Sequence, residues 1–469
     1  MKTIKYEKIA DHVRSLLDSG SLRVGDKLPS IRELKSKMGV SASTIVEAYR
    51  RLEASGLIEA KPRSGYIVRS KQDEGKFLPK TLKTISSTIA LNTSEFITEI
   101  LHQGHDPEAT QLGVAELDTK LLPVEELRAS VTSSMRRAGA RILEYDRLPG
   151  CIELRRQLAV RSLSWGVKIS PDEIIITSGA MDALSIAIQS VASPGDTIAV
   201  ESPTFFGILQ LLESFRLNVV EVPVHSSFGP DLDVLEKVAV TQQIKAFIVV
   251  PNFQNPTGSL MSDVKKKDLA LMANRYNFAI IEDDIYSDLY FGKRRPITIK
   301  SFDINGWVLL CSSVSKSLAP GFRIGWIAPG ERFFKRAESI KATVSGETAT
   351  LPQLAIADFM RLGHYDKHLR KLRDQLQFNI AMTRKTVFKS FPQTTRISDP
   401  SGGFVLWLEL NSKINTLDLF QKMATDKIIF SPGSIFSARK GFKSFIRLSC
   451  GKKWSKEIED AVSAIGRAM

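Results

Sequence analysis

The first 70 residues alternate apolar and polar positions with the period of short helices. Ile9, Val13, Leu16 and Leu17 recur at helical spacing, so the pattern predicts an amphipathic helix over Tyr6–Ser19. A second helix is predicted to begin at Ser30, whose hydroxyl can cap it. Glu33 can then close a capping box, and Gly39 ends this helix after about two turns.

A third helix is predicted from Val40 and Ser41 onward. Its apolar positions share one face: Ile45, Ala48, Tyr49 and Leu52. Two runs then follow, Leu57–Glu59 and Tyr66–Val68, and they predict a hairpin with basic residues at its tip. Two short helices, a tight glycine turn and a hairpin wing indicate a winged helix-turn-helix. A helical protein-interaction module is the alternative.

Beyond residue 173, short β-rich runs alternate with helical stretches. The strand candidates are Ile174–Thr177, Thr197–Val200, Asn218–Val222, Ala246–Val250, Ala279–Glu282 and Trp307–Cys311. This alternation predicts βαβ units and a mostly parallel sheet, with chemistry gathered at the carboxyl ends of its strands. Before this domain, Thr93–Leu101 is predicted to form a short helix.

Composition narrows the class of protein. The 469 residues suggest about three domain-sized units, and 43% hydrophobic and 25% charged residues are typical of a well-cored globular protein. Three widely spaced cysteines favour a reducing compartment over a disulfide framework. No signal peptide and no long apolar run is evident, so we expect a cytoplasmic protein.

Positive charge is densest at the N-terminus. Residues 1–70 hold 14 Lys/Arg against 8 Asp/Glu, a net of +6 out of +14 for the whole chain. This asymmetry favours a nucleic-acid-binding module, with a solvated basic surface as the alternative. A further basic run at Arg361–Lys371, which includes His364 and His368, could help DNA pass across a dimer surface.

The N-terminal segment resembles the winged helix of GntR-type bacterial regulators. The matching residues are Leu28-Pro29-Ser30-Ile31-Arg32, Gly39-Val40-Ser41, Ala48-Tyr49, Leu52, Gly56 and Ser64-Gly65-Tyr66-Ile67-Val68. The resemblance implies that Arg32, the start of the recognition helix and the wing contact DNA. The candidate DNA-binding residues are Ser30, Arg32, Ser41, Ser43, Thr44, Arg63 and Gly65. Ala42 departs from the family, which often has Arg there, so one guanine-reading contact of the family is missing.

Small and polar residues follow the carboxyl ends of the predicted strands. They are Ser178-Gly179-Ala180, then Asn255, then Asp283 and Tyr286, then Ser313 and Ser315-Lys316, then Arg323. Each alone is most simply a loop, capping or surface residue. Together they supply an amine, a carboxylate for a ring nitrogen, and donors for a phosphate, which are the parts of a pyridoxal phosphate site. No metal site is predicted.

From about Gln111 to the C-terminus the chain resembles the class I, fold-type I aminotransferases. The resemblance implies that Lys316 forms the internal aldimine, Asp283 pairs with the ring nitrogen, and Asn255 and Tyr286 bind the phenolic oxygen. It implies a phosphate site formed by Ser178, Gly179, Ala180, Ser313, Ser315 and Arg323. Phe205 stands where the family usually stacks a Tyr on the ring, so the stacking is preserved and the hydroxyl is absent.

Two more residues match the family. Arg447 matches the arginine that clamps a substrate carboxylate, with a structural salt bridge as the alternative. Tyr145 matches a segment that reaches the partner subunit's site, which suggests a homodimer.

A winged helix joined to an aminotransferase-like domain resembles the MocR-type subfamily of GntR regulators. We therefore expect a multidomain chain: a DNA-binding domain over 1–69, a linker over 70–107, and an α/β aminotransferase-like domain with large and small lobes over 108–469. The resemblance implies a head-to-tail homodimer that binds operator DNA, pyridoxal 5'-phosphate and an amine, amino-acid or vitamin B6 effector. It implies a place in the bacterial cytoplasm, at the nucleoid when DNA is bound. Two alternatives stay open: an active aminotransferase with an accessory DNA-binding domain, and a degenerate dimerisation domain.

Overall fold

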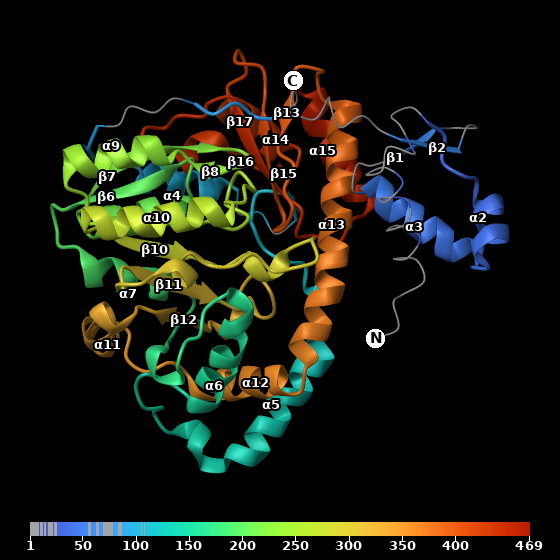
Figure 1. Ribbon diagram of the computed structural model, residues 1–469. Helices are drawn as coiled ribbons and strands as arrows, with labels where there is room; N and C mark the ends of the chain where they lie inside the picture. The colour runs from blue at the N-terminus through green and yellow to red at the C-terminus, as the bar shows by residue number, and fades with distance from the viewer. Residues whose placement is uncertain are drawn as a thin grey trace.

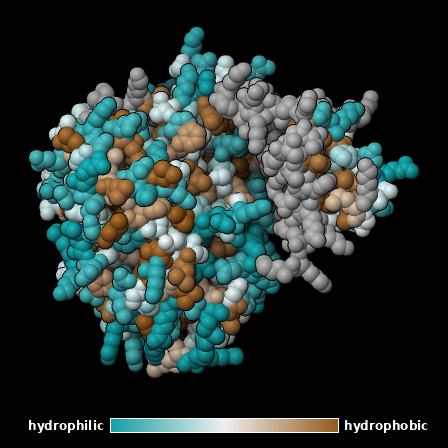
Figure 2. Space-filling model, in the orientation of Figure 1, coloured by the Kyte–Doolittle hydropathy of each residue, from teal (hydrophilic) through white to brown (hydrophobic). Residues whose placement is uncertain are grey.

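The computed structural model shows a small N-terminal unit beside a large α/β body (Figure 1). It describes residues 9, 13, 16, 22, 26–54, 58–61, 65–68, 78–82, 87–104, 106 and 108–469. Figure 2 shows hydrophilic side chains over most of the visible face of the large body, with scattered hydrophobic ones between them. In the described part of the chain, no helix is long and apolar enough to cross a membrane.

The small unit is a helix-turn-helix followed by a two-stranded wing. Its elements are α2 (Ile31–Met38), α3 (Ala42–Ala54), β1 (Ile58–Lys61) and the antiparallel β2 (Gly65–Val68). The predicted apolar face of α3 is buried together with Ile9 and Val13 in one core. The winged fold is confirmed, whereas the bounds of the predicted helix over Tyr6–Ser19 and the candidate Arg63 lie outside the described residues.

Local sequence signals fix the ends of α2. The Ser30 hydroxyl accepts a hydrogen bond from Glu33 N at 3.2 Å, and the Glu33 carboxylate accepts one from Ser30 N at 2.6 Å. This reciprocal capping box satisfies two otherwise free N–H groups. Gly39 ends the helix at φ 60°, a conformation that costs glycine little.

The large body is built on a nine-stranded sheet, in which five adjacent central strands are parallel. The order across the sheet is β3 (Ile89–Ala90), β7 (Asn218–His225), β6 (Thr197–Ser202), β9 (Ala246–Val249), β10 (Ala279–Asp283), β11 (Val308–Ser313), β12 (Gly325–Ala328) and β5 (Ile175–Thr177), with β8 (Gly229–Pro230) paired to β7. The predicted strands are all present. The sequence pattern did not predict β12, which runs antiparallel to both its neighbours.

Helices cover both faces of this sheet (Figure 1). Successive strand residues point to opposite faces, so Ile198 and Val200 join one core while Ala199 joins the other. The first core contains residues of α7 (Ala180–Val191), α8 (Phe206–Ser214) and α11 (Glu331–Val344). The second contains residues of α9 (Leu232–Gln242) and α10 (Asp263–Tyr276).

A smaller lobe packs against the carboxyl ends of the central strands. Its four-stranded antiparallel sheet has the order β13 (Arg396–Ile397), β14 (Val405–Glu409), β17 (Phe445–Ser449) and β16 (Ser431–Pro432). The helices α14 (Thr416–Thr425) and α15 (Lys456–Arg467) belong to this lobe.

The long helix α13 (His364–Ser390) connects the lobes and also contacts α3 of the small unit (Figure 1). Helix α12 (Thr350–Arg361) contacts α13 and packs against α5 (Val124–Ala138) and α6 (Ile152–Ser162). Short 3-10 helices connect these elements: η2 (Thr119–Leu121), η3 (Gly139–Leu143), η4 (Leu163–Trp165), η5 (Pro171–Glu173), η6 (Ser287–Leu289), η7 (Ile299–Phe302), η8 (Pro320–Phe322) and η9 (Gly433–Phe436).

The range predicted as a linker contains folded structure at its end. Strand β3 pairs with β7 at the sheet edge, and α4 (Ser94–Gln103) follows it. The Glu213 carboxylate on α8 accepts hydrogen bonds from Thr93 N at 2.7 Å and Ser94 N at 3.1 Å, which anchors the start of α4. After α4, β4 (Thr110–Gln111) pairs with β15 (Ile428–Ile429) of the small lobe.

Candidate functional site

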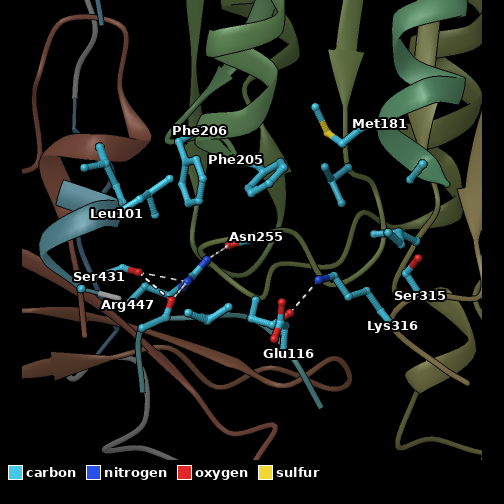
Figure 3. A pocket seen from close by; sticks show the side chains of 18 of the residues that line it. Leu101, Glu116, Met181, Phe205, Phe206, Asn255, Ser315, Lys316, Ser431 and Arg447 are labelled. Carbon is cyan, nitrogen blue, oxygen red and sulfur yellow. Dashed lines mark hydrogen bonds between the residues drawn. The ribbon is translucent and has the colours of Figure 1, made fainter. Parts of the chain in front are cut away.

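A cavity of about 270 Å³ lies between the large sheet and the small lobe. Loops after parallel strands converge there, as expected for the carboxyl ends of such a sheet. Many of the predicted site residues line it: Ala180, Phe205, Asn255, Asp283, Tyr286, Ser315, Lys316, Arg323 and Arg447. Figure 3 shows Lys316 and Arg447 reaching the cavity from opposite sides.

Lys316 follows β11 and extends into the cavity. Its Nζ donates a hydrogen bond to Ala115 O at 2.7 Å. Burial lowers the pKa of Lys316, and the carboxylate of Glu116 opposes that shift. A lowered pKa increases the fraction of neutral amine, which is the form that attacks a carbonyl carbon.

Asp283 ends β10 at the floor of the cavity. It is 5% exposed, and its Oδ1 has no hydrogen-bond partner among the described residues. Burial raises the pKa of Asp283 to about 7, and the neighbouring Asp284 adds to that shift. A buried carboxyl with an open oxygen suits a cationic nitrogen on a ligand.

A second polar corner forms where α7 begins. Gly179 there has φ 95°, and a Cβ at that position would lie 2.5 Å from Arg323 Nη2. The guanidinium of Arg323 donates to Ser178 O at 3.4 Å. In the same corner the Ser315 hydroxyl is buried, with no partner in the part of the chain that the structure describes. A helix N-terminus, a guanidinium and an open hydroxyl together suit a phosphate.

The remaining polar groups form a connected set around Arg447. Arg447 Nη1 donates to Asn255 Oδ1 at 3.0 Å, and Asn255 Nδ2 donates to Tyr286 OH at 3.3 Å. Arg447 Nη2 donates to Ser431 Oγ at 3.0 Å and to Gly113 O (Figure 3). Asn255 therefore links the predicted carboxylate clamp to the predicted ring-binding phenol.

Arg447 is a buried cation without a carboxylate partner among the described residues. The side chain is 1% exposed, and its Nε has no hydrogen-bond partner within the described ranges. Burial lowers the pKa of Arg447 to about 10. Leaving a buried charge unpaired is costly, so the arrangement favours an anionic ligand here.

Of three further predicted residues, Phe205 lines the cavity, whereas Tyr145 and Ser313 do not. The Phe205 ring lines the cavity and lies 4.7 Å from the Phe206 ring, centroid to centroid. Tyr145 is 90% exposed and is not among the cavity residues of this chain. Its predicted role in a partner subunit's site stays a prediction. Ser313 lies just outside the cavity, where its hydroxyl accepts a hydrogen bond from Ser315 N at 3.1 Å.

The described candidate DNA-binding residues cluster at the start of α2, the start of α3 and the wing. Ser30 caps α2, and Arg32 is exposed on its first turn. The Ser41 hydroxyl lies 2.9 Å from Ser43 Oγ and 2.7 Å from Thr44 Oγ1. Gly65 begins β2 with φ 85°. Their contacts with DNA stay predictions.

Sequence reasoning missed several residues of the cavity. Glu116 faces Lys316, and Leu101 comes from α4 within the predicted linker (Figure 3). Gly113 and Ser431 contact Arg447 from segments more than 300 residues apart in sequence. No local pattern marks these four, because only the tertiary fold brings them together.

Comparisons with known proteins agree with both parts of the structure. Residues 108–465 match the family "Aminotransferase class I and II", and residues 5–68 match "Bacterial regulatory proteins, gntR family". The chain is 35% identical to the HTH-type transcriptional regulator YdcR of Escherichia coli K12 over 99% of this chain and 98% of that protein. It is 27% identical to the HTH-type transcriptional regulator NorG of Staphylococcus aureus over 94% and 98%.

Solved aminotransferases share the fold of the large body. The multiple substrate aminotransferase of Thermococcus profundus superposes with a TM-score of 0.75 at 25% identity, covering 79% of this chain and 94% of that one. LysN, the α-aminoadipate aminotransferase of Thermus thermophilus, was solved in complex with N-(5'-phosphopyridoxyl)-L-leucine. It superposes with a TM-score of 0.73 at 25% identity, covering 79% and 93%.

Proposed function

The chain belongs to the GntR-type transcriptional regulators that carry an aminotransferase class I and II domain, and we propose that it is a regulator controlled by pyridoxal 5'-phosphate. Its aminotransferase-like domain would hold the cofactor at Lys316 and sense an amine, an amino acid or the vitamin B6 cofactor itself. The winged helix would then bind operator DNA with an affinity set by that occupancy.

The residues present fit this cofactor. The open Asp283 Oδ1 suits the ring nitrogen, and the open Ser315 hydroxyl beside Gly179 and Arg323 suits the phosphate. Asn255 and Tyr286 stand together as donors for the phenolic oxygen. Phe205 offers a flat ring without a hydroxyl. Both open polar atoms are buried, so each loses a hydrogen bond unless a ligand supplies it.

Each side chain has a distinct task in this proposal. The bound cofactor supplies an aldehyde for amines and a ring that withdraws electrons. Lys316 would hold the cofactor through its side-chain amine. Asp283 keeps a positive charge on the ring nitrogen. Arg447 orients a carboxylate, with Asn255 fixing its guanidinium.

The observation that carries the proposal is the pairing of Lys316 and Arg447 across one cavity in a chain that also has a winged helix. An amine-reactive group on one side and a buried unpaired cation on the other suit a ligand with both an amino and a carboxylate group. Such a ligand contacts both lobes at once. It can therefore favour one arrangement of the lobes over another.

We further propose a homodimer with shared sites. The exposed segment before α6 carries Leu143, 86% exposed, and Tyr145, 90% exposed. Leu163, 65% exposed, is a further large apolar side chain, just after α6. Burial of these side chains against a second copy would remove apolar surface from water. The functional units in this proposal are 1–69, 70–107 and 108–469, and the site of action is the bacterial chromosome.

The test measures DNA binding and cofactor binding in the same protein. Wild type loaded with pyridoxal phosphate is titrated with amines and amino acids while visible absorbance and operator footprints are recorded. Lys316→Ala is expected to lose the covalent cofactor spectrum and the effector response while still binding DNA. Lys293→Ala, an exposed lysine, is the control. An unchanged effector response in Lys316→Ala would refute the cofactor-dependent switch.

An active aminotransferase is the second candidate. Lys316, Asp283 and Arg447 all line the same cavity, and this arrangement supports transamination. Sustained conversion of an amino acid and a keto acid by the full-length protein, without operator binding, would favour this function over regulation.

A further inference from the structure

A second cavity of about 340 Å³ lies at the start of α13. The start of α13 forms one wall, the segment from η2 into α5 forms another, and Lys453 closes it from the segment before α15. The residues that line it do not overlap with those around Lys316. It is therefore a separate hollow in the surface.

One face of α13 makes this cavity basic. His364, Lys367, His368 and Lys371 stand at positions i, i+3, i+4 and i+7, which places them on the same side of the helix. Lysines at i and i+4 repel each other unless an anion lies between them. The stripe thus concentrates positive charge toward the hollow.

Two more lysines line the cavity from other segments. Lys120 comes from η2 and Lys453 from the C-terminal segment, and the one acidic lining residue is Glu126. Over the described ranges, none of the four lining lysines has a side-chain hydrogen bond or ion pair. Four cations from three parts of the chain are therefore available to one ligand.

His368 connects this cavity to the site at Lys316. His368 is 6% exposed, and its Nε2 lies 2.8 Å from the carbonyl oxygen of Ser317, the residue after Lys316. A carbonyl oxygen can only accept, so Nε2 carries the proton of this hydrogen bond. The Ser317 hydroxyl also lies 2.7 Å from Tyr365 OH on α13. Two hydrogen bonds thus join α13 to the segment that holds Lys316.

We propose that this second cavity binds a small phosphate-bearing molecule. Lysine recognises phosphate as a point charge, and a phosphate ester carries about −1.5 to −2 charges at pH 7, more than a single carboxylate, so a group of lysines suits it. The lining residues include four lysines and no arginine. The lysines surround a hollow that has room for more than a bare phosphate. This shape favours a small ester over the backbone of a stiff duplex.

An occupant of this cavity is positioned to affect the first site. It would contact His368, whose ring donates a hydrogen bond to Ser317 O. Because Ser317 directly follows Lys316, a shift of His368 would also shift the backbone at Lys316. This coupling rests on the proposed function, whereas phosphate binding itself does not. The test below therefore measures binding without relying on the cofactor spectrum or on DNA.

The experiment titrates the full-length protein with inorganic phosphate by calorimetry. The protein is first saturated with pyridoxal phosphate, so that the phosphate corner at Gly179 is filled. Wild type is expected to bind phosphate at one further site. Lys371→Gln should weaken this binding about tenfold, the effect of losing one charged hydrogen bond. Lys389→Gln, an equal change of charge in the last turn of α13, should leave it unchanged.

A second measurement locates the ligand. Phosphate is expected to raise the pKa of His368, as followed by NMR of the imidazole protons in wild type and Lys389→Gln. Absence of phosphate binding to the loaded protein, or equal binding by Lys371→Gln and wild type, would overturn the proposal. So would a result in which Lys371→Gln changes only the salt dependence of duplex binding, because the cavity would then contact DNA.

Discussion

Glu201 and Gln254 join the two loops that carry the predicted cofactor ligands Phe205 and Asn255. Glu201 Oε2 accepts from Gln254 Nε2 at 3.3 Å, and the same Nε2 donates to Pro203 O at 2.7 Å. Gln254 thereby ties the loop after β6 to the loop after β9. Glu201 is fully buried, and its Oε1 has no hydrogen-bond partner among the described residues.

Glu201→Gln should change how stability depends on pH. Burial raises the pKa of Glu201 to about 8 from an ordinary value of 4.5. Between these values the folded protein holds a proton that the unfolded chain releases, so wild-type stability falls as pH rises, by up to about 1.4 kcal/mol per pH unit. Glu201→Gln lacks this loss. Its stability advantage should grow from about pH 5 to about pH 8.

Urea unfolding of the cofactor-free protein across this pH range measures the effect. Glu144→Gln removes an exposed carboxyl and serves as the control. A difference between Glu201→Gln and wild type that stays constant with pH would mean that Glu201 does not titrate in this window.

Gly179→Ala should weaken cofactor binding at the phosphate corner. The new Cβ would lie 2.5 Å from Arg323 Nη2, at a residue with φ 95°. We expect a loss of at least about tenfold in pyridoxal phosphate affinity by absorbance titration. Gly195→Ala is the matched control, because it has φ 90° and nothing within 4 Å of the added atom. Equal losses in the two variants would point to backbone strain alone.

Arg447→Met should abolish discrimination for a carboxylate on the ligand. Loss of a buried ion pair of about 3 kcal/mol corresponds to roughly 100-fold weaker binding of an amino acid. An amine without a carboxylate should bind as it does to wild type. Spectral titration of the loaded protein with such a matched pair of ligands decides the point, and a parallel loss for both ligands would contradict the predicted clamp.

Arg32→Ala should reduce the electrostatic part of DNA binding. Arg32 is exposed on the first turn of α2, and the resemblance implies that it contacts DNA. If it neutralises one phosphate, the slope of log affinity against log salt should fall by about one. Arg294→Ala in the large body removes the same charge and should leave the slope unchanged. An unaltered slope for Arg32→Ala would exclude that phosphate contact.

The central strands could be predicted from the sequence because they are buried on both faces. Ala246–Val249 is therefore a wholly apolar run, and Ala279–Asp283 is a short apolar run that ends in two acidic residues. β12 escaped prediction because its four residues begin with a glycine and no local signal gives strand direction. Strand β3 escaped because two residues carry no periodicity.

The candidate site likewise contains residues that the sequence predicts and contacts that it does not. Lys316 and Asp283 stand directly after or at the end of predictable strands, so their neighbourhood follows from sheet topology. The contact of Arg447 with Asn255 joins residues 192 positions apart, and no sequence pattern near either residue predicts it. Burial of Glu201 is equally invisible locally, since its carboxylate would suit a solvent-facing position just as well.

Helix α13 can transmit a small movement near Lys316 over a long distance. At 1.5 Å per residue its 27 residues form a rod of about 40 Å. Its first turns are fastened beside Lys316 through Ser317, and along its length it contacts α3 (Figure 1). When a stiff rod rotates about one end, its other end moves in proportion to its length. A tilt of about 3° displaces the far end of such a rod by about 2 Å. A tilt that barely displaces the residues around Lys316 would therefore displace the far end of α13 by enough to break a hydrogen bond.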